Sequence, residues 1–167
     1  MTVALSVAQP LSSAPALDRA LGESARIVRR IRADAFGSET AMTTGVRRQE
    51  IVRALETASA VAQEPSWDGY GAQPLQPATI AHAFQFLSQL PASFPTPQVA
   101  IDSDGDVAIE WDIAPRRVIS VRVAPDGTLN YAGIAGHSVF HGVEPSREGI
   151  PSAVVSAISR VVAIAAA

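Results

Sequence analysis

The chain has 167 residues, of which 47% are hydrophobic and 17% are charged, and it carries a net charge of −3. A chain of this length forms one ordinary domain and buries roughly 70% of the surface that its unfolded form exposes. It contains no cysteine, which excludes disulfides, thiolate metal sites and thiol nucleophiles. All 13 basic residues are arginine, which also excludes Schiff-base and P-loop lysine chemistry.

The first 14 residues are predicted to form a flexible tail. They are small and apolar, but they contain no cationic segment before the apolar stretch and Pro10 interrupts them, so they make a poor secretory signal. No apolar run along the chain approaches the roughly 18 residues of a membrane span. We therefore expect a cytoplasmic protein with no membrane partner.

Several segments have the apolar spacing of amphipathic helices. The expected helices cover residues 15–36, which are rich in arginine, and then residues 46–63, 77–90 and 151 onward. Thr43 and Thr44 are the expected N-caps of the second helix. The predicted apolar faces are, in chain order, Leu17, Leu21, Val28 and Ile31; Ile51, Leu55, Ala58 and Ala62; Ile80, Phe84, Leu87 and Leu90; and Val154, Val155, Ile158, Val161 and Val162.

Between the third and fourth predicted helices the apolar period changes from 3.6 to 2, which predicts β-strands. Around Asp104-Gly105, a two-residue turn would pair Val99 with Glu110 and would split the apolar residues between both faces. A three-residue loop with Gly105 in the left-handed conformation pairs Val99 with Ile109 instead. The second register is therefore expected, because it keeps the apolar residues on one face.

A second three-residue loop, at residues 125–127, repeats this construction. It pairs Val123 with Leu129 on the apolar face and places Arg122 beside Asn130 on the other face. Two hairpins with matching turns predict an antiparallel meander.

The predicted fold class is α+β. The meander has four to five strands, the fifth being a weakly patterned one near residues 138–143, and helices pack on its apolar face. An N-terminal helical pair precedes it. The expected organisation is a tail over residues 1–14, an Arg-rich helix and linker over 15–45, and a core domain over 46–167.

The opposite face of the predicted sheet carries small side chains, such as Ala108 and Ser120, together with Glu110, Arg122 and Asn130. Small side chains permit close approach, so either a helix of the same chain or a partner packs there. If a partner does, then Glu110, Arg122 and Asn130 are expected to contact it.

Residues 66–72, SWDGYGA, join the second and third predicted helices. As a structural corner, Asp68 would accept hydrogen bonds from backbone N–H groups, the glycines would take positive φ, and Trp67 and Tyr70 would bury their rings. As a pocket, the rings and the acid would stack on a sugar or a base. The corner is favoured, because no second polar cluster is adjacent in sequence.

Recognised catalytic and metal-binding motifs are missing from the sequence. The acids around Asp104 do not form a calcium loop, because Val107 and Ile113 occupy the positions of the required glycine and closing acid. His137 and His141 lie about 13 Å apart along a strand, which disfavours a shared metal. No nucleophile-elbow, P-loop, zincin or dinucleotide-binding motif is present. We expect no metal, no cofactor and no enzymatic activity.

Positive charge gathers near the N-terminus. Residues 26–48 contain six arginines and two acids, a local charge of +4 in an acidic chain. A solvated helix face is the commoner cause of such a run, and the acidic balance argues against nucleic acid as the main ligand. The arginines that are candidates to contact phosphate or an acidic partner are Arg26, Arg29, Arg30, Arg47, Arg48 and Arg53.

A series of short motifs follows in order along residues 67–131. They are W-D-G-Y-G-A at 67–72, a helix start at Pro77, Leu90-Pro91, P-x-V at 97–99, Asp-Gly at 104–105, Glu-Trp at 110–111 and a second Asp-Gly at 126–127. This series resembles a family of small uncharacterised bacterial proteins. The resemblance implies the same α+β fold but no mechanism, and the Arg-rich helix and the alanine tail lie outside it.

These features predict a non-enzymatic protein-interaction module of a bacterium or mobile element, such as an antitoxin-like or inhibitory subunit whose partner is encoded nearby. Homo-oligomerisation is compatible with the same surface. Nucleic-acid binding by the arginine helices, with Trp67 or Tyr70 stacking, is the second hypothesis. A hydrolase built from Asp68, Glu110 and a histidine is the third, and it requires these groups to converge within hydrogen-bond reach.

Overall fold

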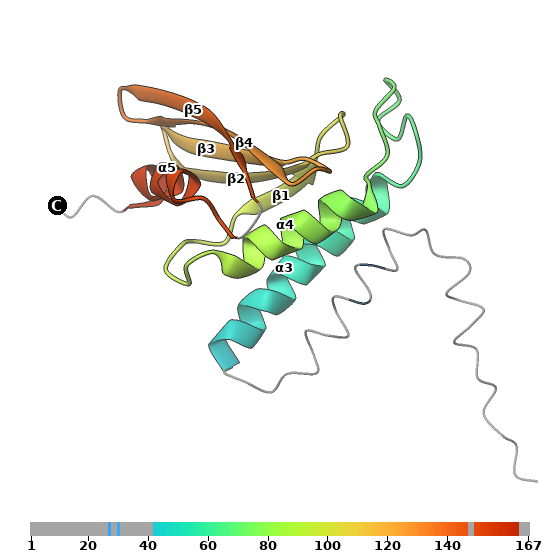
Figure 1. Ribbon diagram of the computed structural model, residues 1–167, viewed down its shortest axis with the longest axis horizontal. Coiled ribbons are helices and arrows are strands. Elements are labelled where there is room, and N and C mark those ends of the chain that lie inside the picture. Colours follow the sequence, from blue (N-terminus) through green and yellow to red (C-terminus); the bar gives the residue numbers. More distant parts are fainter. Residues whose placement is uncertain (1–26, 28–29, 31–41, 147–148, 164–167) are drawn as a thin grey trace, which may run out of the picture.

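The computed structural model describes residues 27, 30, 42–146 and 149–163, with residues 42–48 described by their backbone alone. Its helices are α3 (Met42–Val61), α4 (Pro77–Gln89) and α5 (Ser152–Val162). Its strands are β1 (Gln98–Ile101), β2 (Val107–Ala114), β3 (Arg117–Val123), β4 (Thr128–Ala135) and β5 (Ser138–Pro145). The fold is α+β, as the sequence predicts (Figure 1). The predicted tail and most of the predicted helix over residues 15–36 lie outside the described residues.

Helix α3 begins at Met42, earlier than the expected start at residue 46. Thr43 and Thr44 therefore lie inside its first turns, and the prediction that they are N-caps is wrong. From the sequence, Gly45 is expected to lie in the break between the helices over residues 15–36 and 46–63. A helix interior tolerates a glycine at a cost of only about 1 kcal/mol relative to alanine.

Prolines mark the ends of α4 and α5. Pro77 is the first residue of α4 and Pro151 immediately precedes α5, as expected. Proline fits there because the first turn of a helix leaves its N–H groups unpaired in any case. At the other end of α5, the Nε of Arg117 donates a hydrogen bond of 3.0 Å to the carbonyl of Val161. This contact places a cation where the helix dipole favours one.

The sheet is an antiparallel meander with the strand order β1-β2-β3-β4-β5. Both predicted registers are confirmed, because Val99 pairs with Ile109 and Val123 pairs with Leu129. Gly105 has a φ of 81°, in the left-handed region that the three-residue loop requires. The weakly patterned fifth strand forms as β5 and pairs with β4 along its whole length.

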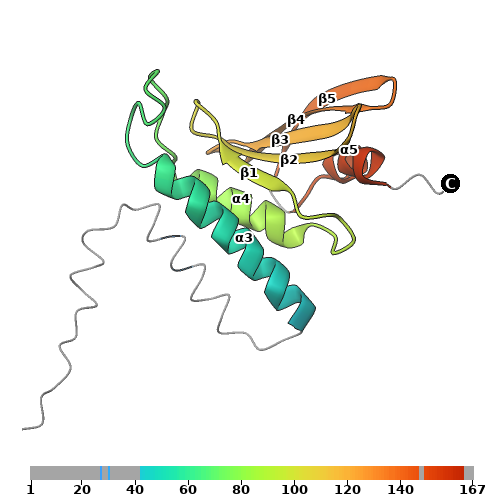
Figure 2. The ribbon, with the colours of Figure 1, turned by 180° about the vertical axis from the view of Figure 1, so that it is seen from behind.

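The described helices lie on one face of the sheet (Figures 1 and 2). Helix α3 lies beside β1 and α4, whereas α4 contacts β2 and β3 and α5 contacts β2 to β5. Most described members of the predicted apolar faces are buried in one continuous core, and those that are only half-buried are Ala58, Phe84, Val155 and Val162. The largest buried side chains are Trp111, Phe86, Leu55, Ile80 and Leu87.

In the β4–β5 hairpin, aromatic rings occupy the space beside glycines. Phe140 pairs with Gly133, and Tyr131 pairs with Gly142. A Cβ atom on Gly133 would lie 2.6 Å from Cζ of Phe140, so the ring fills the place of the missing side chain. The guanidinium carbon of Arg160 on α5 stands 4.5 Å from the centre of the Phe140 ring, and this contact joins the helix to the hairpin.

Candidate functional site

The corner at residues 66–72 connects α3 to α4 and is joined to the β1–β2 turn. The Oδ1 atom of Asp68 accepts hydrogen bonds from the backbone N–H of Tyr70 at 2.7 Å and of Ala72 at 3.1 Å. The backbone N–H of Gln73 donates to the carbonyl of Ser103 at 2.7 Å. These contacts give Asp68 the bonding that the sequence predicts for a structural corner.

The same hydrogen bonds hold the pKa of Asp68 below its ordinary value. The backbone N–H of Tyr70 makes the largest contribution, followed by that of Ala72. N–H donors favour the charged form of a carboxylate, so Asp68 is ionised at neutral pH and bound to its own turn. Such a group is suited to holding the turn and is poorly suited to donating a proton.

The two aromatic residues of the corner differ in exposure. Trp67 is half-buried against the core, and its Nε1 donates to the carbonyl of Gln73 at 3.0 Å. Tyr70 is 95% exposed, so the prediction that its ring is buried is wrong. Tyr70 lies between Gly69 and Gly71, which both have positive φ, in a loop that projects from the body of the domain (Figure 1).

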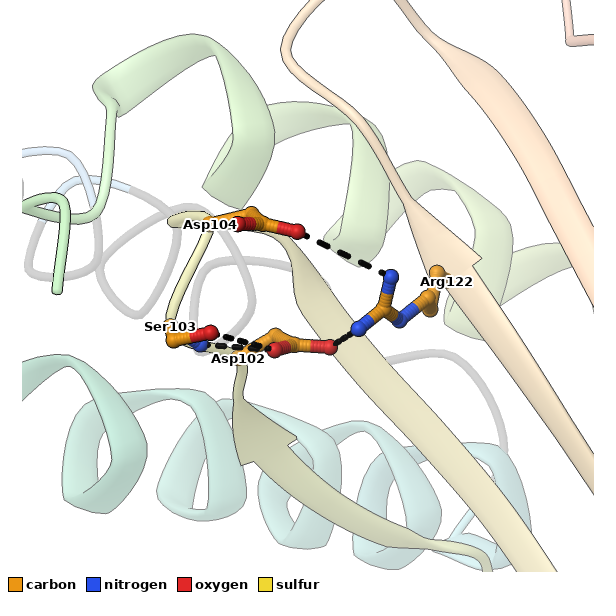
Figure 3. Close-up of polar contacts among 4 residues, drawn as sticks. All are labelled: Asp102, Ser103, Asp104 and Arg122. Carbon is orange, nitrogen blue, oxygen red and sulfur yellow. Dashed lines mark hydrogen bonds and ion pairs between the residues drawn. The ribbon is translucent and has the colours of Figure 1, made fainter.

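Arg122 of β3 is paired with acids of the β1–β2 turn (Figure 3). Its Nη2 contacts Oδ2 of Asp102, and its Nη1 lies 3.9 Å from Oδ2 of Asp104. Asp102 is itself held by the backbone N–H of Ser103, which lies 2.7 Å from its Oδ1. The register confirms that Arg122 lies beside Asn130, as predicted. The guanidinium is therefore neutralised within the molecule.

The face of the sheet opposite α3, α4 and α5 is called the uncovered face below. Among the described residues no helix packs on it (Figure 2), so the alternative of a helix from the same chain gains no support. Across β2 to β5 it carries three cross-strand rows, which are Asp112, Val118, Ile134 and Val139; Glu110, Ser120, Ala132 and His141; and Ala108, Arg122, Asn130 and Val143. Gln98 and Ala100 of β1 continue the second and third rows.

Exposed aliphatic side chains lie at two places on the β4–β5 side of the uncovered face, with His141 between them. Val139 is 73% exposed and Val143 is 63% exposed. Ile134 pairs directly with Val139 and is 37% exposed. Complete burial of an aliphatic side chain of this size is worth about 1.5–3 kcal/mol, so covering these side chains is favourable.

The β2 side of the same face is acidic. Glu110 and Asp112 are both exposed, and the one arginine of the three rows, Arg122, is already paired. The uncovered face thus combines an aliphatic half with an acidic half.

The predicted basic cluster is described only in part. Arg30 is helical and exposed, whereas Arg26 and Arg29 lie outside the described residues. Arg47 and Arg48 belong to α3, but their side chains also lie outside the description. The common face of these arginines stays a prediction.

The residues of the hydrolase hypothesis lie apart. Asp68 is in the corner between α3 and α4, and Glu110 is on the uncovered face. His141 shares a row with Glu110, but β3 and β4 lie between them, a separation of about 14 Å at the usual strand spacing. His82 is on α4, beside Gly127, on the other side of the sheet. These groups do not come within hydrogen-bond reach of one another.

Within the described residues, no group of three or more histidine, cysteine, aspartate or glutamate side chains is placed to hold a metal ion. No helix of the described ranges is both long enough and apolar enough to cross a membrane.

Comparison of the chain with protein-family models, with curated proteins and with solved structures finds no match. The resemblance of residues 67–131 to a family of small bacterial proteins therefore stays a prediction.

Sequence reasoning missed the residues that make half of the uncovered face apolar, namely Ile134, Val139 and Val143. A signal for them exists in β5, where both valines alternate with the inward-facing Phe140 and Gly142. The period-two pattern of β5 is weak for two reasons. One of its inward positions is a glycine, and two of its outward positions are valines, so the strand has apolar residues on both faces.

Proposed function

We propose that the protein is a non-enzymatic binding module that docks a partner protein on the uncovered face of its sheet. The observation that carries the proposal is the exposure of Val139 and Val143, at 73% and 63%, on a face that no described helix covers. Ser120 and Ala132, at the centre of this face, are small and let another surface approach closely.

The charges of the face indicate the chemistry of the partner. Glu110 and Asp112 are exposed acids, whereas Arg122 is neutralised by Asp102 and Asp104. A complementary surface therefore presents apolar residues flanked by arginine or lysine. The same face of a second copy would bring further acids and an arginine that is already paired, so a different protein is the better fit for this face.

An antitoxin-like or inhibitory subunit of a bacterium or mobile element is the class that this surface supports best. Such a protein acts by covering its partner and needs no catalytic group of its own. We expect the partner to be encoded nearby. The nucleic-acid hypothesis places phosphate on the arginine helices and not on the uncovered face, which is acidic and repels phosphate.

The test is co-expression of the full chain with the products of the adjacent genes, followed by calorimetric measurement of the Kd of any complex. Val143→Asp places a charge in the aliphatic half and is expected to raise the Kd at least about tenfold. Ala81→Asp is the control, because Ala81 is exposed on α4, away from both the uncovered face and the residues that contact β1. An unchanged Kd for Val143→Asp contradicts the proposal, as does the absence of any complex or a complex of this chain with itself alone.

A further inference from the structure

A groove between α3 and β1 forms a second surface, separate from the uncovered face. It has a volume of about 520 Å³ and is bounded by Ala54, Ala58 and Val61 of the helix and by Val99 and Ile101 of the strand. The small alanines leave room between the two elements. Within the described residues β1 is the outer strand of the sheet and pairs with β2 alone (Figure 2). The groove therefore follows a free edge of the sheet.

The free edge of β1 presents backbone groups to this groove. The N–H of Asp102 donates to the carbonyl of Asp106 at 2.9 Å, so Asp102 faces β2, and so does Ala100 two residues earlier. Val99 and Ile101 alternate with them, and their N–H and C=O groups point away from β2. Within the described ranges these outward groups make no hydrogen bond.

Arg53 supplies the charge of the groove. It is exposed, it is the charged residue among those that line the groove, and it makes no ion pair within the part of the chain that the structure describes. Trp67 lines the groove with an aromatic ring. An occupant that matches these walls has a small or aliphatic side chain toward Ala54 and Ala58 and a carboxylate within reach of Arg53.

We infer that the groove binds an extended, acidic segment of a partner polypeptide, which adds to β1 as a further strand of the sheet. Only another extended main chain offers donors and acceptors at the repeat of the unpaired groups on Val99 and Ile101. The short length of β1 and Pro97 just before it limit uncontrolled pairing at this edge. This inference does not rest on docking at the uncovered face.

The probe is a displayed library of random peptides of about ten residues, selected on the full-length protein and followed by synthesis of the consensus peptide. The consensus is expected to alternate small or aliphatic residues and to contain aspartate or glutamate. Replacing its acid by lysine, or changing Arg53→Glu in the protein, is expected to raise the Kd at least about tenfold. The lysine peptide and the Arg53→Glu protein together are expected to recover most of the lost affinity.

The backbone contacts are tested by proline. Val99→Pro removes an outward N–H and leaves the hydrogen bonds to β2 in place, so the variant is expected to fold and to bind the peptide at least about tenfold more weakly. Ala100→Pro is the matched control, because it removes a bond to β2 and lowers stability instead. Should Val99→Pro not fold, N-methylation of the peptide at alternate amides gives the same information. Methylation of the amides that face β1 is expected to lower the affinity, whereas methylation of the other amides is expected to leave it unchanged.

Several outcomes would overturn this inference. Failure of the selection to enrich any sequence is one, and a consensus peptide that binds equally well after N-methylation in either register is another. Binding that is lost in Val143→Asp but kept in Ala58→Trp, which fills the groove, assigns the peptide to the uncovered face. A further such outcome is protection of the Val99 and Ile101 amides from hydrogen exchange in the absence of peptide, because it shows that the edge is already occupied. Protection that is independent of protein concentration assigns the edge to another segment of this chain. Protection that increases with protein concentration assigns it to a second copy.

Discussion

The ring of Phe140 on β5 lies against Gly133 on β4, directly across the hairpin. The next inward-facing pair repeats the arrangement in the opposite sense, with Tyr131 beside Gly142. An aromatic neighbour offsets the weakness of a glycine inside a strand. These pairs secure the inward side of β5, and the exposed valines of the same strand consequently point to the uncovered face.

Gly133→Ala is expected to lower the free energy of unfolding by about 1–3 kcal/mol, measured by urea denaturation. The added Cβ would lie 2.6 Å from Cζ of Phe140 and 2.9 Å from the carbonyl oxygen of Val118. In a Phe140→Leu background the cost is expected to be smaller, because one of the two clashes is relieved. An equal cost in both backgrounds would show that the ring does not fill this space.

Trp67→Ala is expected to lower the free energy of unfolding by about 2 kcal/mol, less than the 3–5 kcal/mol typical of a fully buried aromatic ring, because Trp67 is only half-buried. Trp67→Phe keeps a ring but loses the hydrogen bond to Gln73, and it is expected to cost about 1 kcal/mol. Thermal or urea unfolding measures both. A Trp67→Ala variant as stable as the parent contradicts the structural role of the corner.

Asp68 and Asp106 have pKa shifts of opposite sign. Backbone N–H donors, first that of Tyr70, lower the pKa of Asp68, whereas burial and then the charges of Asp104 and Asp126 raise the pKa of Asp106. The lowered pKa means that ionised Asp68 stabilises the fold above about pH 4, and this contribution is lost as the pH falls through the folded-state pKa. The raised pKa means that ionised Asp106 destabilises the fold at neutral pH.

At neutral pH, Asp68→Asn is therefore expected to lower the free energy of unfolding and Asp106→Asn to raise it. Both differences from the parent are expected to shrink at pH values below about 4, where the carboxyls take up protons. Urea unfolding at neutral and acidic pH measures them, with the exposed Asp112→Asn as the control. Effects of the same sign at neutral pH would contradict the assigned causes.

Thr79→Val is expected to raise the free energy of unfolding by about 1 kcal/mol. The Thr79 hydroxyl is fully buried on α4 and has no hydrogen-bond partner within the described part of the chain. Valine has nearly the same shape without the polar group. Thr57→Val, at an exposed hydroxyl that bonds to the carbonyl of Arg53 at 2.9 Å, is expected to change stability by less than about 0.5 kcal/mol. A less stable Thr79→Val variant would indicate a partner for the hydroxyl.

The strand registers are predictable from sequence because few residues adopt positive φ without strain. Gly105 and Gly127 end the two three-residue loops at a φ of 81°, and the period-two pattern then selects the pairing. The start of α3 is not predictable in this way, since Gly45 is compatible with a break or with a helix interior.

Side-chain exposure and contacts between distant segments are less accessible to sequence reasoning. Ala58 belongs to the predicted core face of its helix but lines the groove beside β1, because the position of α3 depends on packing against a strand far along the chain. The pairing of Arg122 with Asp102 likewise arises from where the β1–β2 turn lies over β3.

The uncovered face is the proposed docking surface for the partner protein. The most direct measurement is the accessibility of valine methyl groups to a soluble paramagnetic agent, recorded by NMR while the co-purified partner is added to the full chain. We predict that the methyl groups of Val139 and Val143 become protected when the partner is added. Protection of Val61 with Val139 and Val143 still accessible would contradict the account.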